Sequence, residues 1–145
     1  MLYSNNVRFR MTAKLPTIVV IDHSPASLSL YRRSTALLDI DLLTFSSPAE
    51  SLAFLADNPV DLLFLEIVMR DMDGLMMLRK LRDMELHQHT AVVIVTSKDY
   101  AQDRRLAEQL GSREYRLKPL RSQEIREIIS RYISPDSADS ENIRT

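Results

Sequence analysis

Residues 63–74, LFLEIVMRDMDG, form the stretch of the chain that decides its fold. The apolar run at its start ends at one carboxylate, Glu66, and the loop that follows ends at Gly74, one of only two glycines in the chain. A run that is almost continuously apolar is typical of a strand covered on both faces of a sheet. The sequence therefore predicts a buried strand whose end carries an acid.

Four further segments have the length and composition of strands. The second and fifth of the five expected strands are more mixed than the others, as strands at sheet edges tend to be. The expected strands are residues 17–21, 41–45, 61–65, 91–96 and 114–117.

Segments with helical periodicity lie between these strands. Their apolar residues recur at a spacing near 3.6, and their expected ranges are 25–38, 47–57, 74–86, 100–110 and 122–133. Ser24 and Ser47 are expected as N-caps, since each precedes a proline and Ser47 has Glu50 at capping-box spacing. Ser122 is expected to cap the last helix, and Gly111 to end the helix before it.

The regular alternation of strand and helix predicts a doubly wound α/β fold, in which a parallel sheet carries helices on both faces. In such a sheet a ligand site lies beyond the carboxyl ends of the central strands. Asp22 and His23 follow the first expected strand, and Glu66 follows the third. Thr96 is the last residue of the fourth strand, and Lys118 follows the fifth. Carboxylates, a hydroxyl and an ammonium group together suit phosphoryl or metal chemistry.

Composition excludes several classes of function. The 145 residues have a net charge of −1, no cysteine and no apolar run long enough to span a membrane. We therefore expect no general nucleic-acid-binding surface, no thiolate metal site and no membrane segment, and we favour a cytoplasmic protein. One domain is expected at residues 15–133, between a flexible N-terminal extension at 1–14 and a disordered tail at 134–145.

On these residues the chain resembles the receiver domains of response regulators in two-component signalling, over residues 17–133. The resemblance implies a flavodoxin-like (βα)5 fold of the chemotaxis-receiver kind, with strand order 2-1-3-4-5. It also implies that Thr96 and Tyr115 are switch residues that move together between two states. The resemblance rests on residues at characteristic spacings. Asp22 follows the first expected strand, Met69 and Gly74 lie in the loop after Glu66, Thr96 is 30 residues after Glu66, and Lys118 is 22 residues after Thr96. The peptide bond between Lys118 and Pro119 is compatible with the trans form.

Three departures from the family's pattern fall at this site. Glu66 stands at the position of the phosphoacceptor aspartate, His23 at that of the second metal-binding acid, and Arg70 at that of the proline after Met69. Imidazole is a poor ligand for Mg²⁺, so we expect weak or no Mg²⁺ binding, at most through Asp22, and no other cofactor.

Glutamate at this position also disfavours phosphorylation. Its extra methylene moves the carboxylate by about 1.5 Å, and a shift of that order can cost roughly 100-fold in a positioned reaction. We expect Glu66 to pair with Lys118 instead. A contact with the Thr96 hydroxyl, and a pairing of Arg70 with Asp22 or Glu66, are further options.

The expected function is that of a stand-alone, atypical receiver domain that is not an enzyme and acts by phosphorylation-independent contact with another protein. The partner would be a histidine kinase, a downstream effector or a second copy of the chain. An arginine-rich composition suits the contact face that the resemblance implies. This face comprises Arg104, Arg105, Glu108, Arg113, Tyr115, Arg116, Gln123 and Arg126.

Two alternatives stay open at this stage. One is a conventional phospho-accepting receiver, with Glu66, His23 or Ser97 as the acceptor. The other is a hydrolase built on Asp22, His23 and Ser24. The hydrolase is disfavoured because adjacent residues point in different directions and no nucleophile elbow is present.

Overall fold

The computed structural model describes residues 14–133, so the expected tail at 134–145 and all of the expected extension except Lys14 lie outside the described residues. Within this range five parallel strands form one sheet in the order β2-β1-β3-β4-β5, which confirms the predicted order. The strands are β1 (Thr17–Ile21), β2 (Asp41–Phe45), β3 (Leu62–Leu65), β4 (Ala91–Thr96) and β5 (Glu114–Leu117).

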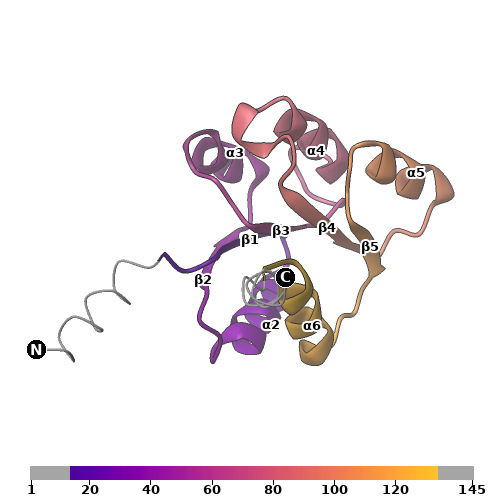
Figure 1. Ribbon diagram of the computed structural model, residues 1–145. Helices are drawn as coiled ribbons and strands as arrows, with labels where there is room; N and C mark the ends of the chain where they lie inside the picture. The colour runs from indigo at the N-terminus through magenta and orange to yellow at the C-terminus, as the bar shows by residue number, and fades with distance from the viewer. Residues whose placement is uncertain (1–13, 134–145) are drawn as a thin grey trace, which may run out of the picture.

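Helices cover both faces of the sheet, as the alternation predicted (Figure 1). Helices α3, α4 and α5 lie on one face, and α2 and α6 lie on the other. The helices are α2 (Pro25–Thr35), α3 (Pro48–Asp57), α4 (Gly74–Arg82), the short 3-10 helix η1 (Glu85–His87), α5 (Ala101–Gln109) and α6 (Ser122–Ile133). The architecture is therefore the expected flavodoxin-like α/β fold.

The core consists of two clusters that are separated by the sheet. Successive side chains of a strand point to opposite faces, so Val19 and Leu63 pack with α3 and α4 whereas Val20 and Phe64 pack with α2 and α6. The central strands β1 and β3 are buried along their whole length. This explains why their sequences are apolar without alternation.

Capping residues behave largely as predicted. The hydroxyls of Ser24 and Ser47 accept hydrogen bonds from the N–H groups three residues further on, and Gly111 follows α5 with φ +80°. The N-cap prediction for Ser122 is wrong, because α6 begins at Ser122 itself. Its hydroxyl instead accepts a hydrogen bond of 2.7 Å from Ser34, which joins α6 to α2.

Two helices are shorter than their sequences predict. Helix α2 ends at Thr35, and the expected helix at 74–86 divides into α4 and η1. The backbone becomes extended at Met84, with φ −83° and ψ 133°, which separates the two. The guanidinium of Arg82 donates hydrogen bonds to the carbonyls of His87 and Thr90 just beyond, and to those of Leu110 and Gly111 at the end of α5.

The last turn of α6 lies beside the start of β1. Lys14, Leu15, Tyr132 and Ile133 line a shared cavity of about 510 Å³. Because β1 begins here, this cavity is at the amino edge of the sheet, opposite the strand ends that carry the candidate site.

Candidate site at the carboxyl edge of the sheet

Four strand ends bring the predicted site residues together. Asp22 and Glu66 come directly after β1 and β3, Thr96 is the last residue of β4, and Lys118 follows β5. The two acids are only 2% and 3% exposed. Buried carboxylates need charged or hydrogen-bonding partners, so their contacts define the site.

Lys118 is the partner of both acids. Its Nζ lies 2.8 Å from Oδ2 of Asp22 and 2.8 Å from Oε1 of Glu66. The expected Glu66–Lys118 ion pair is confirmed, and the sharing of Lys118 with Asp22 adds to it. The Lys118–Pro119 peptide bond is cis, so the trans form considered from the sequence is wrong.

The remaining carboxylate oxygens bind backbone N–H groups. Oδ1 of Asp22 accepts from Ser24 at 2.9 Å, and Oε2 of Glu66 accepts from Ile67 at 2.6 Å and Val68 at 3.2 Å. Every oxygen of the two buried acids therefore has a donor, which stabilises both negative charges.

These contacts favour the charged form of Lys118. Burial opposes the ammonium charge, but the hydrogen bonds and charges of Asp22 and Glu66 outweigh burial and raise the pKa of Lys118 above its ordinary value. The lysine is therefore a fixed cation at the centre of the site.

Gly74 allows helix α4 to begin against the backbone of Glu66. A Cβ atom at Gly74 would lie 2.1 Å from the carbonyl oxygen of Glu66 and 2.8 Å from the Cα of Ile67. The Gly74 N–H donates to the Ile67 carbonyl at 2.8 Å, which closes the loop. Gly74, the glycine of residues 63–74, therefore helps to support the backbone of Glu66.

The two expected switch residues meet at Lys98. The Thr96 hydroxyl accepts a hydrogen bond from the Lys98 N–H at 3.2 Å, and the Tyr115 hydroxyl donates to the Lys98 carbonyl at 2.7 Å. No hydrogen bond joins Thr96 to Glu66 in the described part of the chain, so that option is not realised. Sequence reasoning missed Lys98, although its place two residues after a strand-end hydroxyl was a usable signal.

A family model of the response regulator receiver domain matches residues 18–130. The chain belongs to the receiver-domain family of response regulators. Its receiver domain is 29% identical over 104 residues to a probable cyclic di-GMP phosphodiesterase of Vibrio cholerae, covering 72% of this chain and 23% of that protein. It is 27% identical over 111 residues to the cyclic di-GMP phosphodiesterase response regulator RpfG of Xanthomonas campestris, covering 75% of this chain and 29% of RpfG.

Solved receiver domains share the fold. A CheY-like response regulator receiver domain protein of Methanospirillum hungatei superposes with a TM-score of 0.78 at 18% identity, and the alignment covers 87% of this chain and 99% of that one. This similarity shows the fold alone.

Two of the three departures from the family's pattern lie at the surface of this receiver domain. His23 and Arg70 are exposed. The considered pairing of Arg70 with Asp22 or Glu66 is absent, since both acids bind Lys118 and backbone N–H groups instead. Glu66, the third of these residues, is buried.

The donor set does not fit a Mg²⁺ site. Among residues 14–133 no group of three or more His, Cys, Asp or Glu side chains is arranged to hold a metal ion. The oxygens of Asp22 and Glu66 that would coordinate one are directed to Lys118 and to N–H groups. An ammonium group 2.8 Å from both acids also places a like charge where a cation would need to enter.

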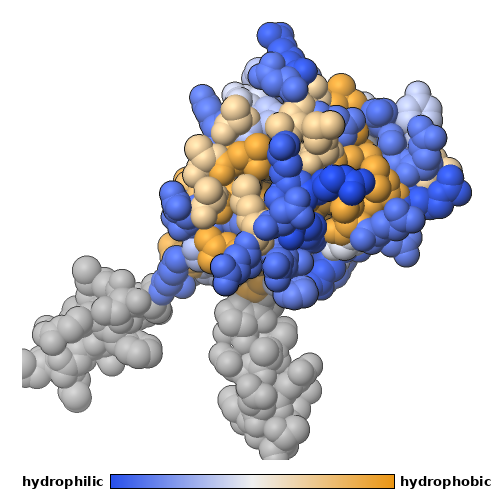
Figure 2. Space-filling view, turned by 90° about the horizontal axis from the view of Figure 1, so that it is seen from above, coloured by the Kyte–Doolittle hydropathy of each residue, from blue (hydrophilic) through white to orange (hydrophobic). Residues whose placement is uncertain are grey.

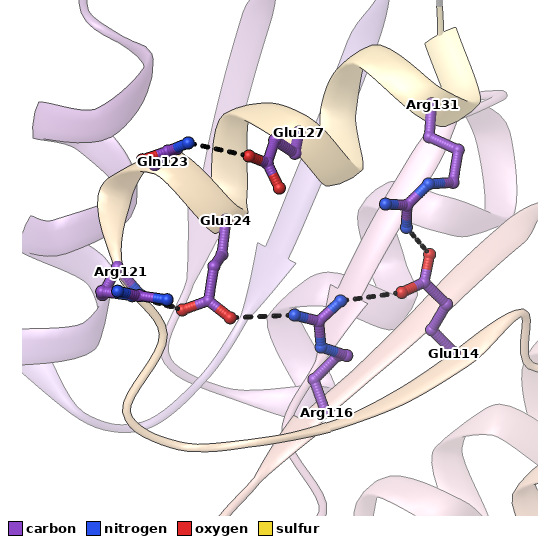
Figure 3. A network of polar contacts seen from close by, with 7 residues as sticks. All are labelled: Glu114, Arg116, Arg121, Gln123, Glu124, Glu127 and Arg131. Carbon is purple, nitrogen blue, oxygen red and sulfur yellow. Dashed lines mark hydrogen bonds and ion pairs between the residues drawn. The ribbon is translucent and has the colours of Figure 1, made fainter.

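The expected contact face is only partly free for a partner. Figure 3 shows Arg116 between Glu114 and Glu124, with Arg131 also bound to Glu114. The salt bridges of Arg116 to Glu114 and Glu124 are 3.1 and 2.9 Å long. Arg104 is held by Asp99 at 2.8 Å and lies over the Tyr115 ring, 4.5 Å from its centroid. The three remaining arginines of the predicted set, Arg105, Arg113 and Arg126, are exposed.

Apolar side chains are exposed on the side of α3, α4 and α5. Figure 2 shows this side, where apolar surface alternates with hydrophilic groups. Val68, Met76, Leu86 and Tyr100 are all exposed.

In residues 14–133 no helix is long and apolar enough to cross a membrane.

Proposed function

We propose that this receiver domain signals through contact with another protein, without phosphorylation of the residue that follows β3. The observation that carries this proposal is the position of Lys118 Nζ at 2.8 Å from both Glu66 and Asp22. A lysine so placed is already engaged by the protein's own carboxylates.

The contacts of Glu66 support this proposal. An acid that acts as a nucleophile needs a free oxygen, yet Oε1 faces Lys118 and Oε2 accepts two backbone hydrogen bonds. Phosphorylation at Glu66 would require these contacts to break without a metal ion to replace Lys118.

Glu66 also imitates only part of a phosphoryl group. It carries one negative charge, whereas a phosphoryl group carries about −1.5 to −2. We infer that Glu66 holds Lys118 in a single, permanent arrangement, with Thr96 and Tyr115 tied through Lys98. The partner would be a histidine kinase, an effector or a second copy of the chain, bound through the face with Arg105 and Arg113.

A phosphorylation assay tests the proposal. The protein is incubated with acetyl phosphate and Mg²⁺, and the phosphoryl group is sought by intact-mass spectrometry in the wild type, Glu66→Asp and the double variant Glu66→Asp with His23→Asp. We expect no modification of the wild type and modification of the double variant, because only the latter restores both the acceptor and the second metal-binding acid.

Peptide mapping covers the alternative of a conventional receiver. Stoichiometric phosphorylation of wild-type Glu66, His23 or Ser97 would contradict the proposal and favour that alternative. If the double variant also stays unmodified, the loss of phosphorylation does not come from Glu66 and His23 alone, and that part of the explanation fails.

A second measurement tests the permanent arrangement. Amide chemical shifts are compared for the wild type, Glu66→Ala and the control Glu50→Ala, whose side chain is exposed on α3. We expect Glu66→Ala to shift the resonances of Thr96, Lys98 and Tyr115, and Glu50→Ala to leave them unchanged. Unchanged resonances in Glu66→Ala would show that Glu66 does not control these residues.

A further inference from the structure

A second cavity lies beside Lys118, between α2, the end of β4 and the segment that leads from Lys118 into α6. Its volume is about 220 Å³. The residues that matter for its chemistry are Ala26, Tyr31, Val95, Lys118, Leu120 and Ile125.

The floor of this cavity is hydrophobic core. Val95, Leu120 and Ile125 are buried members of the cluster between the sheet and α2 and α6. An apolar cavity of about 150 Å³ in another protein is large enough to bind benzene. A cavity of 220 Å³ therefore has room for a substituted benzene or an aliphatic molecule of similar size.

Two residues with hydroxyl groups, Ser27 and Tyr31, line this cavity. The side chain of Tyr31 is only 3% exposed, and the centroid of its ring lies 5.0 Å from that of Phe64. Burial, together with the charges of Asp22 and Glu66, raises the pKa of Tyr31, so the hydroxyl stays protonated. A protonated hydroxyl in the lining of an otherwise apolar cavity can donate a hydrogen bond to a ligand that carries an acceptor atom.

Charge at this place selects against anions. Lys118 contributes one positive charge, but Asp22 and Glu66 contribute two negative charges at 2.8 Å from it. The group carries a net charge of −1 with these three side chains ionised, so a carboxylate or phosphate ligand would meet repulsion.

From this combination we propose that the cavity is a binding site for a small neutral molecule with an apolar body and one hydrogen-bond acceptor, which the Tyr31 hydroxyl binds. The molecule would contact the side chain of Lys118, whose ammonium group holds Glu66. This binding site does not depend on the proposed function, because ligand binding in the cavity does not require that Glu66 stays unphosphorylated.

The test uses benzyl alcohol, with toluene and benzoate as matched probes that lack the acceptor or carry a charge. Each probe is titrated into the ¹⁵N-labelled protein, and amide shifts are followed. We expect saturable shifts with benzyl alcohol at Val95, Leu120 and Ile125, weaker binding of toluene and no saturable binding of benzoate.

Two alanines supply a matched pair of variants. Ala26 and Ala49 are both exposed, and each follows the proline that begins a helix, but only Ala26 lines the cavity. We expect Ala26→Leu to weaken benzyl alcohol binding at least tenfold and Ala49→Leu to leave it unchanged. Equal binding by both variants would overturn the proposal.

A second variant tests the hydroxyl directly. Tyr31→Phe keeps the ring and is expected to weaken benzyl alcohol binding by about 2- to 10-fold while leaving toluene binding unchanged. If the amide spectrum shows that Ala26→Leu is unfolded, Tyr31→Phe is the variant that tests the proposed site. An unaltered preference for benzyl alcohol over toluene in Tyr31→Phe, or an absence of saturable shifts in the wild type, would contradict the proposed site.

Discussion

Lys118 is the cation that pairs with both buried acids of the site. Replacing it by methionine would leave Asp22 and Glu66 facing each other without their cation. Because breaking a buried ion pair on one side costs about 3–5 kcal/mol, we expect Lys118→Met to lower the free energy of unfolding by about that amount. Urea unfolding measures the loss, and Lys80→Met, at an exposed lysine of α4, is the control.

Glu66→Gln provides an internal check on this result. It removes one of the two charges, so Lys118→Met combined with Glu66→Gln should be more stable than Lys118→Met alone. If the double variant is less stable than the single one, the loss does not come from unpaired carboxylates.

Gly74 presents a second test at the scale of one residue. An added Cβ would lie 2.1 Å from the Glu66 carbonyl oxygen, so Gly74→Ala must displace α4 or the loop. We expect a loss of about 3 kcal/mol in unfolding free energy, at the upper end of the usual cost of overpacking. Gly111→Asn, at a positive φ that asparagine tolerates, should cost less, and an equal cost at both glycines would contradict the steric explanation.

The convergence of the residues at the strand ends was predictable, because the carboxyl ends of all strands in a parallel sheet lie at one edge. The Glu66–Lys118 pair follows from that rule together with side-chain length. The convergence of Thr96 and Tyr115 on Lys98 does not, because it depends on the course of the loop after β4 and on the Tyr115 rotamer. No spacing in the sequence encodes either.

At the scale of elements, η1 is joined to α3 by a fully buried histidine. The Nε2 of His87 donates to the Leu55 carbonyl at 2.7 Å, so its Nδ1 accepts from the Thr90 hydroxyl at 2.9 Å. His87→Leu would leave both partners unsatisfied, and we expect a loss of about 3 kcal/mol in unfolding free energy. His89→Leu, at an exposed histidine two residues later, should change stability little, and a similar loss in both variants would argue against these hydrogen bonds.

Strand β5 and helix α6 are joined by the polar network of Figure 3. Burial opposes the charge of Glu114, but hydrogen bonds from Tyr132, Arg131 and Arg116 outweigh it and lower the pKa of Glu114 below its ordinary value. A carboxyl group whose pKa is lowered by folding adds stability above its unfolded pKa of about 4.3, and this stability is lost as the pH falls through the folded pKa.

The stability difference between the wild type and Glu114→Gln should therefore depend on pH. We expect a constant advantage of the wild type from pH 7 down to about pH 5, and a shrinking advantage at lower pH. Urea unfolding between pH 7 and pH 3 provides the measurement. A difference that stays constant to pH 3 would mean that the network does not act through the Glu114 charge.

The ends of helices were less predictable than the helices themselves. The apolar spacing of residues 74–86 continues through Met84, but the backbone turns there and Arg82 binds the carbonyls beyond. Similarly, Ser122 looks like a cap, yet its hydroxyl binds Ser34 of α2. Tertiary contacts decide both ends, and a local pattern does not contain them.

At the scale of the whole molecule, one sheet belongs to two hydrophobic clusters at once. Alternate residues of β1, β3 and β4 enter each cluster, so neither can be lost without disrupting the strands of the other. We expect one cooperative unfolding transition, with coincident curves by far-ultraviolet circular dichroism and tyrosine fluorescence.

Two truncations test this coupling. Leu81→Ala in the first cluster and Ile128→Ala in the second should each cost about 2–5 kcal/mol and shift the same single transition. Two separate transitions in either variant would show that the faces unfold independently.

The neighbourhood of Lys14 and Ile133 has a practical consequence for anyone who wishes to rearrange this domain. Because both residues line one cavity, a short linker could join them and the chain could be reopened at Leu37, whose side chain is 99% exposed. The circular permutant would keep every strand and helix of residues 14–133 intact. Its junction would lie at the amino edge of the sheet, opposite the edge that carries Asp22, so fluorophores placed there would report the integrity of the fold without contacting the acids.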